Sequence, residues 1–364
     1  MGRNRGASAA TVATERAADQ FAAAEAALER GDVAKAERAA QAARRGFARW
    51  LGADHPDVGG ALALAAEIAA RRGDRRGAVA RSEAAVALLA RAARRHRGAV
   101  EVARMHGRAL GQLGMRLREA GDYAAAGRCL RRALALARRR FGPRDPEAAG
   151  AMNQLGIWCK YTDRFSEGER LYRAALALTV RERGPRHPEV AAICHNLGGL
   201  FHEQEQFRRA EPFARRAARI YVATLGPDHP DTVADRAALA AVLIGVGRLA
   251  EAERLLRGAL RWFARHFGRD HYEVAVNLGN LAALLHQRGR RVPALRMQRR
   301  ALALYEQSLG PTHPETARAA QNLAALLGPA PRHRRAVAQL LAQAQRGLAR
   351  RAGRSARPLP SGAP

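Results

Sequence analysis

The feature that most constrains the fold of this chain is a short motif that returns at a fixed interval. Residues 225–230 read Leu-Gly-Pro-Asp-His-Pro, and an earlier copy at residues 51–56 reads Leu-Gly-Ala-Asp-His-Pro. From the middle of the chain onward, equivalent glycines are 42 residues apart: Gly142, Gly184, Gly226, Gly268 and Gly310. A fixed period of this length is typical of a solenoid, in which one supersecondary unit stacks on the next.

Each copy of the motif contains the residues that end one helix and begin another. Glycine suits the left-handed position after a helix end, and proline is accepted at the first helical position. The acidic residue that follows the proline lies at the positive end of the helix dipole. The first helices of the repeats are therefore expected to begin near Glu15, Asp57, Glu101, Glu147, Glu189, Asp231, Glu273 and Glu315. Each second helix should start about 18 residues later, which gives eight antiparallel hairpins.

The two ends of the chain and one hairpin depart from the period. Residues 1–13 are small and polar, and residues 352–364 contain three prolines, so we expect both segments to be disordered. The helical repeat domain should then occupy residues 14–351. A six-residue insertion is expected near residues 91–98, and residues 332–351 predict a basic closing helix, because solenoid ends need atypical repeats.

Apolar and small residues recur in fixed columns within the hairpins. One leucine column runs through the first helices: Leu113, Leu155, Leu197, Leu239, Leu281 and Leu323. A glycine or alanine directly follows each leucine. The second helices have two small positions seven residues apart, as at Ala210 and Ala217. Small residues at these positions let two helices approach closely at one crossing point.

Together, these columns and the turn resemble the tetratricopeptide repeat. The 42-residue unit is similar to the kinesin-light-chain variety, which is also widespread in bacterial proteins, whereas the ordinary unit has about 34 residues. The resemblance covers roughly residues 15–350 and implies an all-α fold, a right-handed superhelical solenoid of about eight antiparallel helical hairpins. It also implies a non-enzymatic scaffold in the cytoplasm of a bacterial cell, which binds a protein or an extended peptide in its concave groove.

The recurrent histidines of the motif are poor candidates for a metal site. They are His55, His187, His229, His271 and His313. Equivalent residues in stacked hairpins lie at least ~8–10 Å apart, whereas zinc bonds are ~2.0–2.1 Å long. Because Asp145 also replaces one of them, we expect these side chains to start helices and pack loops.

The sequence contains none of the common catalytic motifs, whether a P-loop, GxSxG, HExxH or a dinucleotide-binding GxGxxG after a strand. We therefore expect no enzymatic activity, no cofactor and no small-molecule substrate. The three scattered cysteines fit a reducing compartment such as the cytoplasm. No stretch approaches the ~18 apolar residues of a membrane span.

Arginine dominates the charge of the chain, which has a formal net charge of +30. One arginine column recurs on the second helices: Arg131, Arg173, Arg215, Arg257 and Arg299. A glutamate stands four residues before three of them, in the order that stabilises a helix. A solvated outer face would explain this pattern. The alternative is a surface for nucleic acid or another polyanion, because the net charge favours acidic partners.

The most informative candidate site is a column of side-chain amides directly before the leucines of the first helices. It consists of Gln112, Gln154, Asn196, Asn280 and Asn322, and Ala238 interrupts it. An amide in an apolar stripe costs stability unless it is hydrogen-bonded. The resemblance implies that this position faces the groove and holds a peptide backbone. Alternatively, the amides bond carbonyl groups of neighbouring helices.

Four further residues are expected to line the same groove, namely Lys160, His195, His202 and His286. This set is neutral to basic. An acidic peptide or a C-terminal carboxylate is therefore the ligand that the sequence favours.

Overall fold

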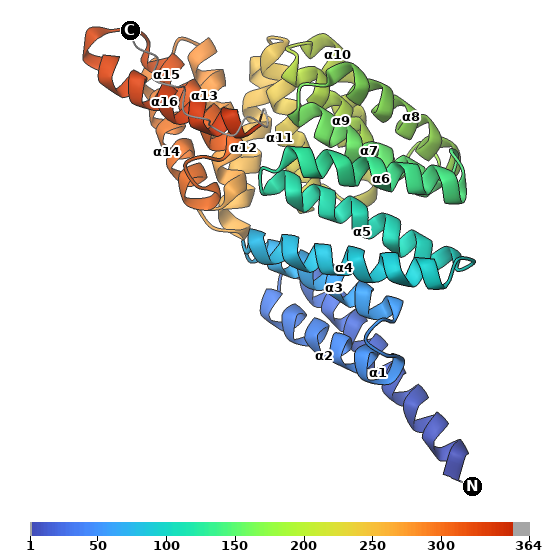
Figure 1. Cartoon of the computed structure of the whole chain (residues 1–364). Helices are drawn as coiled ribbons and strands as arrows, with labels where there is room; N and C mark the ends of the chain where they lie inside the picture. The colour runs from blue at the N-terminus through green and yellow to red at the C-terminus, as the bar shows by residue number, and fades with distance from the viewer. Residues whose placement is uncertain (1, 352–364) are drawn as a thin grey trace, which may run out of the picture. The chain divides into compact units, whose positions relative to one another are not determined.

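In the computed structural model of the chain, residues 2–351 are described, and their regular structure consists of sixteen α-helices and one short 3-10 helix (Figure 1). Consecutive helices form hairpins with short turns, so the predicted all-α solenoid of eight hairpins is confirmed. The observed first helices begin within one residue of the expected position in seven of the eight hairpins. The local signals in the motif were therefore sufficient to locate most helix boundaries.

Residues 1–158 form one compact unit. Its helices are α1 (Gly2–Glu29), α2 (Val33–Leu51), α3 (Pro56–Arg71), α4 (Arg75–Arg95), α5 (Val100–Glu119), α6 (Tyr123–Phe141) and most of α7 (Pro146–Tyr161). Within each of the first three hairpins the two helices pack on each other, and α2 and α4 also pack on the first helix of the next hairpin. Helix α4 has 21 residues against 19 in α6 and ends inside the segment where the insertion was expected.

The described residues from Cys159 onward form the second compact unit. Its helices are α8 (Phe165–Arg183), α9 (Pro188–Glu203), α10 (Phe207–Leu225), α11 (Pro230–Gly245), α12 (Leu249–His266), α13 (Tyr272–Gln287), α14 (Arg291–Leu309), α15 (Pro314–Leu327), η1 (Pro331–His333) and α16 (Arg334–Arg351). Each second helix from α8 to α14 packs on the first helix of the following hairpin. The first helices α9, α11 and α13 also contact one another in turn.

Helix α1 begins much earlier than expected, because it includes residues 2–13, for which we predicted disorder. This segment contains Ala7, Ala9, Ala10 and Ala13, and alanine has the highest helix propensity. Elongating an existing helix costs far less than nucleating one, and the later turns of α1 are anchored by buried alanines such as Ala24. The predicted disordered tail, residues 352–364, lies outside the described residues.

The motif histidines begin the first helices, as predicted. In five hairpins the histidine Nδ1 accepts a hydrogen bond from the backbone N–H two residues later, at 3.2–3.3 Å: His55, His187, His229, His271 and His313. At the start of α7 the carboxylate of Asp145 accepts the same bond from the N–H of Glu147 at 2.9 Å. Histidine and aspartate are therefore interchangeable at this position as helix N-caps.

The small-residue columns lie at close helix crossings. A Cβ atom added at Gly198 in α9 would lie 3.4 Å from the backbone nitrogen of Ala214 in α10 and 3.5 Å from the carbonyl oxygen of Ala210. Ala210 and Ala217 are both fully buried. The two helices therefore approach almost backbone to backbone, and only glycine or alanine fits between them.

No helix within residues 2–351 is both long enough and apolar enough to cross a membrane.

Candidate binding surface of the first helices

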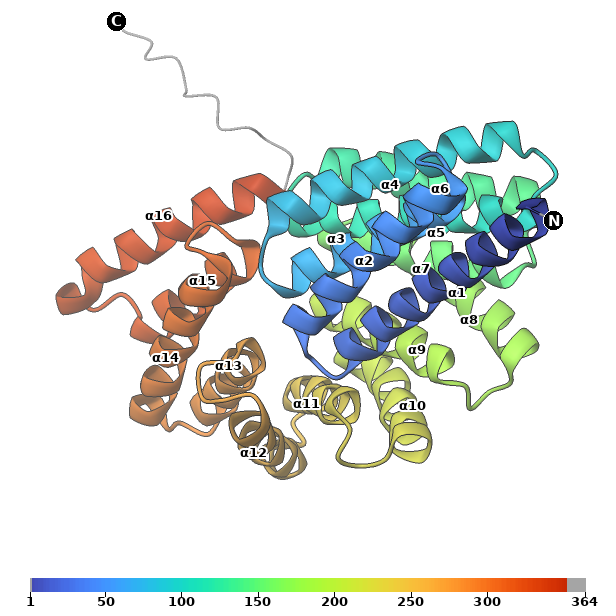
Figure 2. The same ribbon diagram turned by 90° about the horizontal axis from the view of Figure 1, so that it is seen from below.

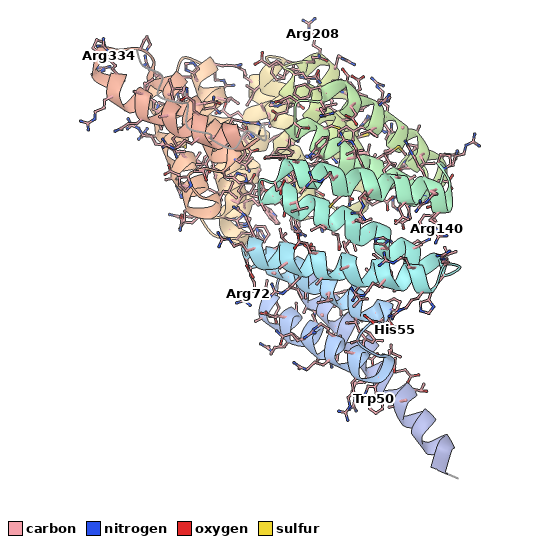
Figure 3. All side chains as sticks on the ribbon, viewed as in Figure 1. Trp50, His55, Arg72, Arg140, Arg208 and Arg334 are labelled. Atoms are coloured by element: carbon pink, nitrogen blue, oxygen red, sulfur yellow. The ribbon has the colours of Figure 1, made fainter. Side chains whose placement is uncertain are left out.

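In the second compact unit, the first and second helices differ strongly in charge. The first helices α9, α11, α13 and α15 contain two bases, Arg236 and Arg318, and six acids: Glu189, Glu203, Asp231, Asp235, Glu273 and Glu315. The second helices from α8 to α16 contain 22 arginines and seven glutamates. Arg208 of α10 and Arg334 of α16 point away from the ribbon (Figure 3). The positive charge of this unit therefore lies on its second helices.

The first helices of this unit present a common side. In Figure 2, α12 and α14 lie outside α11 and α13, so the first helices occupy the inside of the row. A group of polar side chains from the first helices α9, α13 and α15 and from the end of α7 interact with one another. We call the following residues the polar cluster: Lys160, Tyr161, His202, Glu203, Tyr272, Glu315 and Arg318.

An ion pair between two distant repeats forms the centre of the polar cluster. Arg318 of α15 donates from Nη1 to Oε1 of Glu203, at the end of α9, at 2.7 Å. The two residues are 115 positions apart, and their side chains are 35% and 19% exposed. Burial opposes the charge of Arg318, but the carboxylates of Glu315 and Glu203 outweigh it and raise the pKa of Arg318. Burial likewise opposes the charge of Glu203, yet Arg318 keeps its pKa below the ordinary value.

Lys160 and His202 lie beside this ion pair. The ammonium of Lys160 is 5.2 Å from the centre of the Tyr161 ring, and a Cβ atom on Gly199 would lie 3.6 Å from it. Lys160 therefore reaches across α9 at the position of a glycine. Burial lowers the pKa of His202, so this ring is neutral near pH 7. Its edge meets Phe207, with ring centres 5.4 Å apart.

Tyrosines form the other side of the polar cluster. The rings of Tyr272 and Tyr305 meet edge to face, with centres 5.7 Å apart. Burial raises the pKa of both phenols, and the negative charge of Glu315 adds to this effect. Both hydroxyl groups therefore stay protonated at neutral pH, beside the carboxylates and Arg318.

A second polar group lies on the adjacent first helices. Nδ1 of His195 lies 2.8 Å from Oδ1 of Asp235, whose side chain is only 3% exposed, whereas the His195 side chain is 42% exposed. The other carboxylate oxygen of Asp235 is buried without a hydrogen-bond partner. In α13, the fully buried Asn277 donates to the carbonyl oxygen of Glu273 at 2.7 Å, and its Oδ1 is also unpartnered. Both unpartnered atoms are hydrogen-bond acceptors.

This arrangement can bind charged and polar groups, but it lacks an activated nucleophile. The thiol of Cys194 in α9 is fully buried, and burial raises its pKa to about 11. Burial and the charge of Asp235 raise the pKa of Tyr221 to about 12. In the part of the chain that is described, no three His, Cys, Asp or Glu side chains are placed to hold a metal ion.

The structure brings together only some of the residues predicted from the sequence. Lys160 and His202 join the polar cluster, and His195 belongs to the pair with Asp235. His286 is exposed at the end of α13, and among the described residues no polar contact joins it to the cluster.

The amides of the predicted column are in different surroundings. Gln112, Asn196 and Asn280 are half-buried, and Asn322 is exposed. The amide oxygen of Gln154 lies so close to Gly111 of α5 that it fills the space of a missing side chain there, which fits the packing alternative at this position. The role of the whole column stays a prediction.

Several residues of the surface were missed, although the columns of the repeat contain a signal for them. Arg318 stands at a position that is small or apolar in the four preceding repeats, at Gly150, Ala192, Ala234 and Val276, whereas the third repeat has Arg108 there. Asp235 and Asn277 occupy another column, which is otherwise apolar: Ala109, Ala151, Ile193 and Ala319. A polar residue that breaks an apolar column was the signal to follow, because burial of such a residue needs a partner.

The chain matches a family model described as tetratricopeptide repeat over residues 105–178, 147–223 and 234–307. No curated protein sequence matches it. Among solved structures, it is similar to the Rap conjugation gene regulator of plasmid pLS20 in complex with the Phr* peptide. The identity is 16% and the TM-score 0.62, over 81% of this chain and 75% of that one. The apo form of RapI has 13% identity and a TM-score of 0.60, over 80% and 98% of the two chains.

A putative kinesin light chain from Podosopora anserina, with nearly identical TPR-like repeats, is similar over 55% of this chain and 95% of its own. Its identity is 20% and the TM-score is 0.45.

Proposed function

Because this chain belongs to the tetratricopeptide repeat family, we propose that it is a non-enzymatic scaffold that binds an extended segment of a partner protein on its first helices. The observation that carries this proposal is the polar cluster, to which separate repeats contribute side chains that remain partly exposed. Such a surface suits a ligand that runs across several repeats. The Rap regulator, which has a similar fold, is in complex with the Phr* peptide, and this supports the binding of a peptide. The three cysteines, Cys129, Cys159 and Cys194, are scattered and form no CxxC pair, which supports a reducing, cytoplasmic location.

In this proposal, the amides of Asn196, Asn280 and Asn322 hold the backbone of the partner segment. A side-chain amide offers both a donor and an acceptor, so it can pair with a peptide N–H and C=O together. Such contacts do not depend on the side chains of the ligand. Selectivity then comes from the charged groups nearby, Lys160, His202 and the ion pair of Arg318 with Glu203.

The test is a triple variant in which Asn196, Asn280 and Asn322 are replaced by alanine. We expect a near-native melting temperature together with loss of the partners that the wild-type protein captures from its native cell extract. Gln307→Ala, which removes an exposed amide of α14, is the matched control and should retain every partner. If the triple variant melts far lower, or still captures all partners, the amides are structural.

A second candidate function is binding of nucleic acid or another polyanion by the second helices. The predicted pairs within these helices form, as between Glu169 and Arg173 or Glu211 and Arg215, but arginines outnumber glutamates threefold. If these arginines contact phosphates, affinity for RNA or DNA should fall steeply between ~50 and ~200 mM salt, because counterions are released. Absence of binding at the lower salt concentration removes this candidate.

A further inference from the structure

We propose that the polar cluster is a site for a guanidinium group: the first helices bind an arginine-bearing segment of the partner, and Arg318 occupies this site in the free protein. The inference rests on the function proposed above and names the chemistry of the ligand. It reverses the acidic peptide that the sequence favoured.

The first observation is the local charge. The whole chain has a net charge of +30, yet the first helices α9, α11, α13 and α15 contain three times as many acids as bases. The first helices are acidic and the second helices of the same hairpins are basic, so a ligand is selected by repulsion as well as by attraction. A cationic segment is repelled by the second helices and attracted only to the first helices.

The second observation is that a guanidinium already lies in the cluster. Arg318 is bound to Glu203 at 2.7 Å, and Glu315 and Tyr161 are close enough to favour its charge. In the other repeats of this unit its column contains only small or apolar residues, namely Ala192, Ala234 and Val276. Carboxylates and tyrosine rings are the groups that bind guanidinium, through paired hydrogen bonds and contacts with aromatic faces.

A third observation comes from the adjacent helices. The buried Asp235 and Asn277 each keep one acceptor oxygen without a donor. The partly exposed side chain of His195 contacts the other oxygen of Asp235. Unpartnered buried acceptors are unfavourable. These helices therefore offer acceptors, and an arginine side chain offers five donors.

These facts also predict arginine rather than lysine in the ligand. The planar guanidinium can bind a carboxylate through two parallel hydrogen bonds and stack on an aromatic ring, whereas an ammonium acts as a point charge. An acidic ligand would instead have to share Arg318 and Lys160 with Glu203 and Glu315, whose charges repel it.

The experiment uses the full chain and three fluorescein-labelled decapeptides of Gly, Ser and Ala that contain two Arg, two Lys or two Glu. Binding is measured by fluorescence anisotropy at about 150 mM salt, where long-range surface fields are screened. We expect the Arg peptide to bind most tightly. Glu203→Gln and Glu315→Gln should each weaken it by about tenfold or more, because each removes a desolvated charge partner. Glu169→Gln, which removes an acid of the second helix α8, should leave the affinity unchanged.

Arg318→Ala distinguishes this proposal from the alternative that Arg318 itself binds an acidic ligand. If Arg318 is a stand-in for the ligand, its removal should tighten binding of the Arg peptide, by about tenfold if it frees one charge pair. If Arg318 is itself a ligand-binding group, the same variant should weaken binding of the Glu peptide, and the proposal is wrong. Thermal melting checks that the Arg318→Ala variant folds. If it does not fold, the effect of Glu315→Gln on binding of the Arg peptide decides the question.

A random peptide library displayed on phage separates this inference from the proposed function. Selected peptides that bind the wild type but not Glu203→Gln, and that are rich in arginine, support both. Selected peptides that depend on the Asn196, Asn280 and Asn322 amides but lack arginine overturn the ligand chemistry and leave the scaffold function intact. If no peptide is selected and none of the three decapeptides binds, both the ligand chemistry and the scaffold function are overturned.

Discussion

At the scale of single residues, the turn inside each of the first seven hairpins depends on one residue with positive φ. In five of the hairpins this residue is a glycine, with φ between 71° and 88°: Gly31, Gly73, Gly121, Gly247 and Gly289. In the fourth and fifth hairpins the equivalent residues are Asp163 and Glu205, with φ of 57° and 56°. The left-handed conformation is unfavourable for residues with a Cβ atom, so these two turns are strained.

Glu205→Gly should therefore stabilise the protein, by about 0.5–1 kcal/mol, because the relief of strain exceeds the entropy cost of glycine. A higher melting temperature, followed by circular dichroism, would check this. Gly247→Ala is the reciprocal control and should lower the melting temperature, since it forces a Cβ atom into a φ of 83°. A destabilised Glu205→Gly variant would show that the glutamate side chain contributes more than its backbone costs.

At the scale of helices, the small residues determine how closely the two helices of a hairpin can pack. Ala217 is fully buried against Val190, Ala191 and Cys194 of α9. Ala259 occupies the equivalent position of α12 in the next hairpin and is 3% exposed. Neither position has room for a longer side chain without separating the helices.

Ala217→Leu and Ala259→Leu should each destabilise the protein by roughly 1–3 kcal/mol, because the added atoms overpack a close crossing. Thermal melting compares both variants with Ala223→Leu, which adds the same atoms at an exposed position of α10 and should have little effect. Since each hairpin contacts only its neighbours, the two losses should be separate local events. Melting curves identical to that of the wild type would mean that these residues do not form the crossings.

At the scale of the whole molecule, buried histidines link stability to pH. Burial lowers the pKa values of His106, His202 and His271. In addition, His271 accepts a backbone hydrogen bond through Nδ1, which protonation would abolish. Groups of this kind bind a proton more readily in the unfolded chain than in the folded one.

Stability should therefore be highest above the ordinary histidine pKa of about 6.5 and should fall as the pH falls below it. Melting temperatures between pH 8 and pH 5 would reveal the decline. His271→Asp should reduce it, because an aspartate serves as the helix cap at Asp145 without titrating in this range. A melting temperature that is constant from pH 7.5 to pH 5.5 would contradict the linkage.

The sequence by itself determined the helices and their order, because the signals for both are local. A glycine, a proline and an acidic residue within six positions specify a helix boundary, and the histidine between them completes it as an N-cap. The 42-residue period then specified the stacking of the hairpins, since each apolar face can be buried only on the next hairpin. The start of α1 was missed because helix elongation through its alanines leaves no boundary signal.

Only the tertiary structure decided which polar residues meet. Glu203 and Arg318 are 115 residues apart, and Asp235 reaches His195 in the preceding repeat. Such partners depend on how several successive hairpins are rotated and spaced, which no single repeat encodes. The columns of the repeat could mark Arg318, Asp235 and Asn277 as exceptions, but periodicity places a residue on a helix face and does not determine the distances across that face. The sequence alone could not show that carboxylates from other repeats lie beside Lys160 and His195.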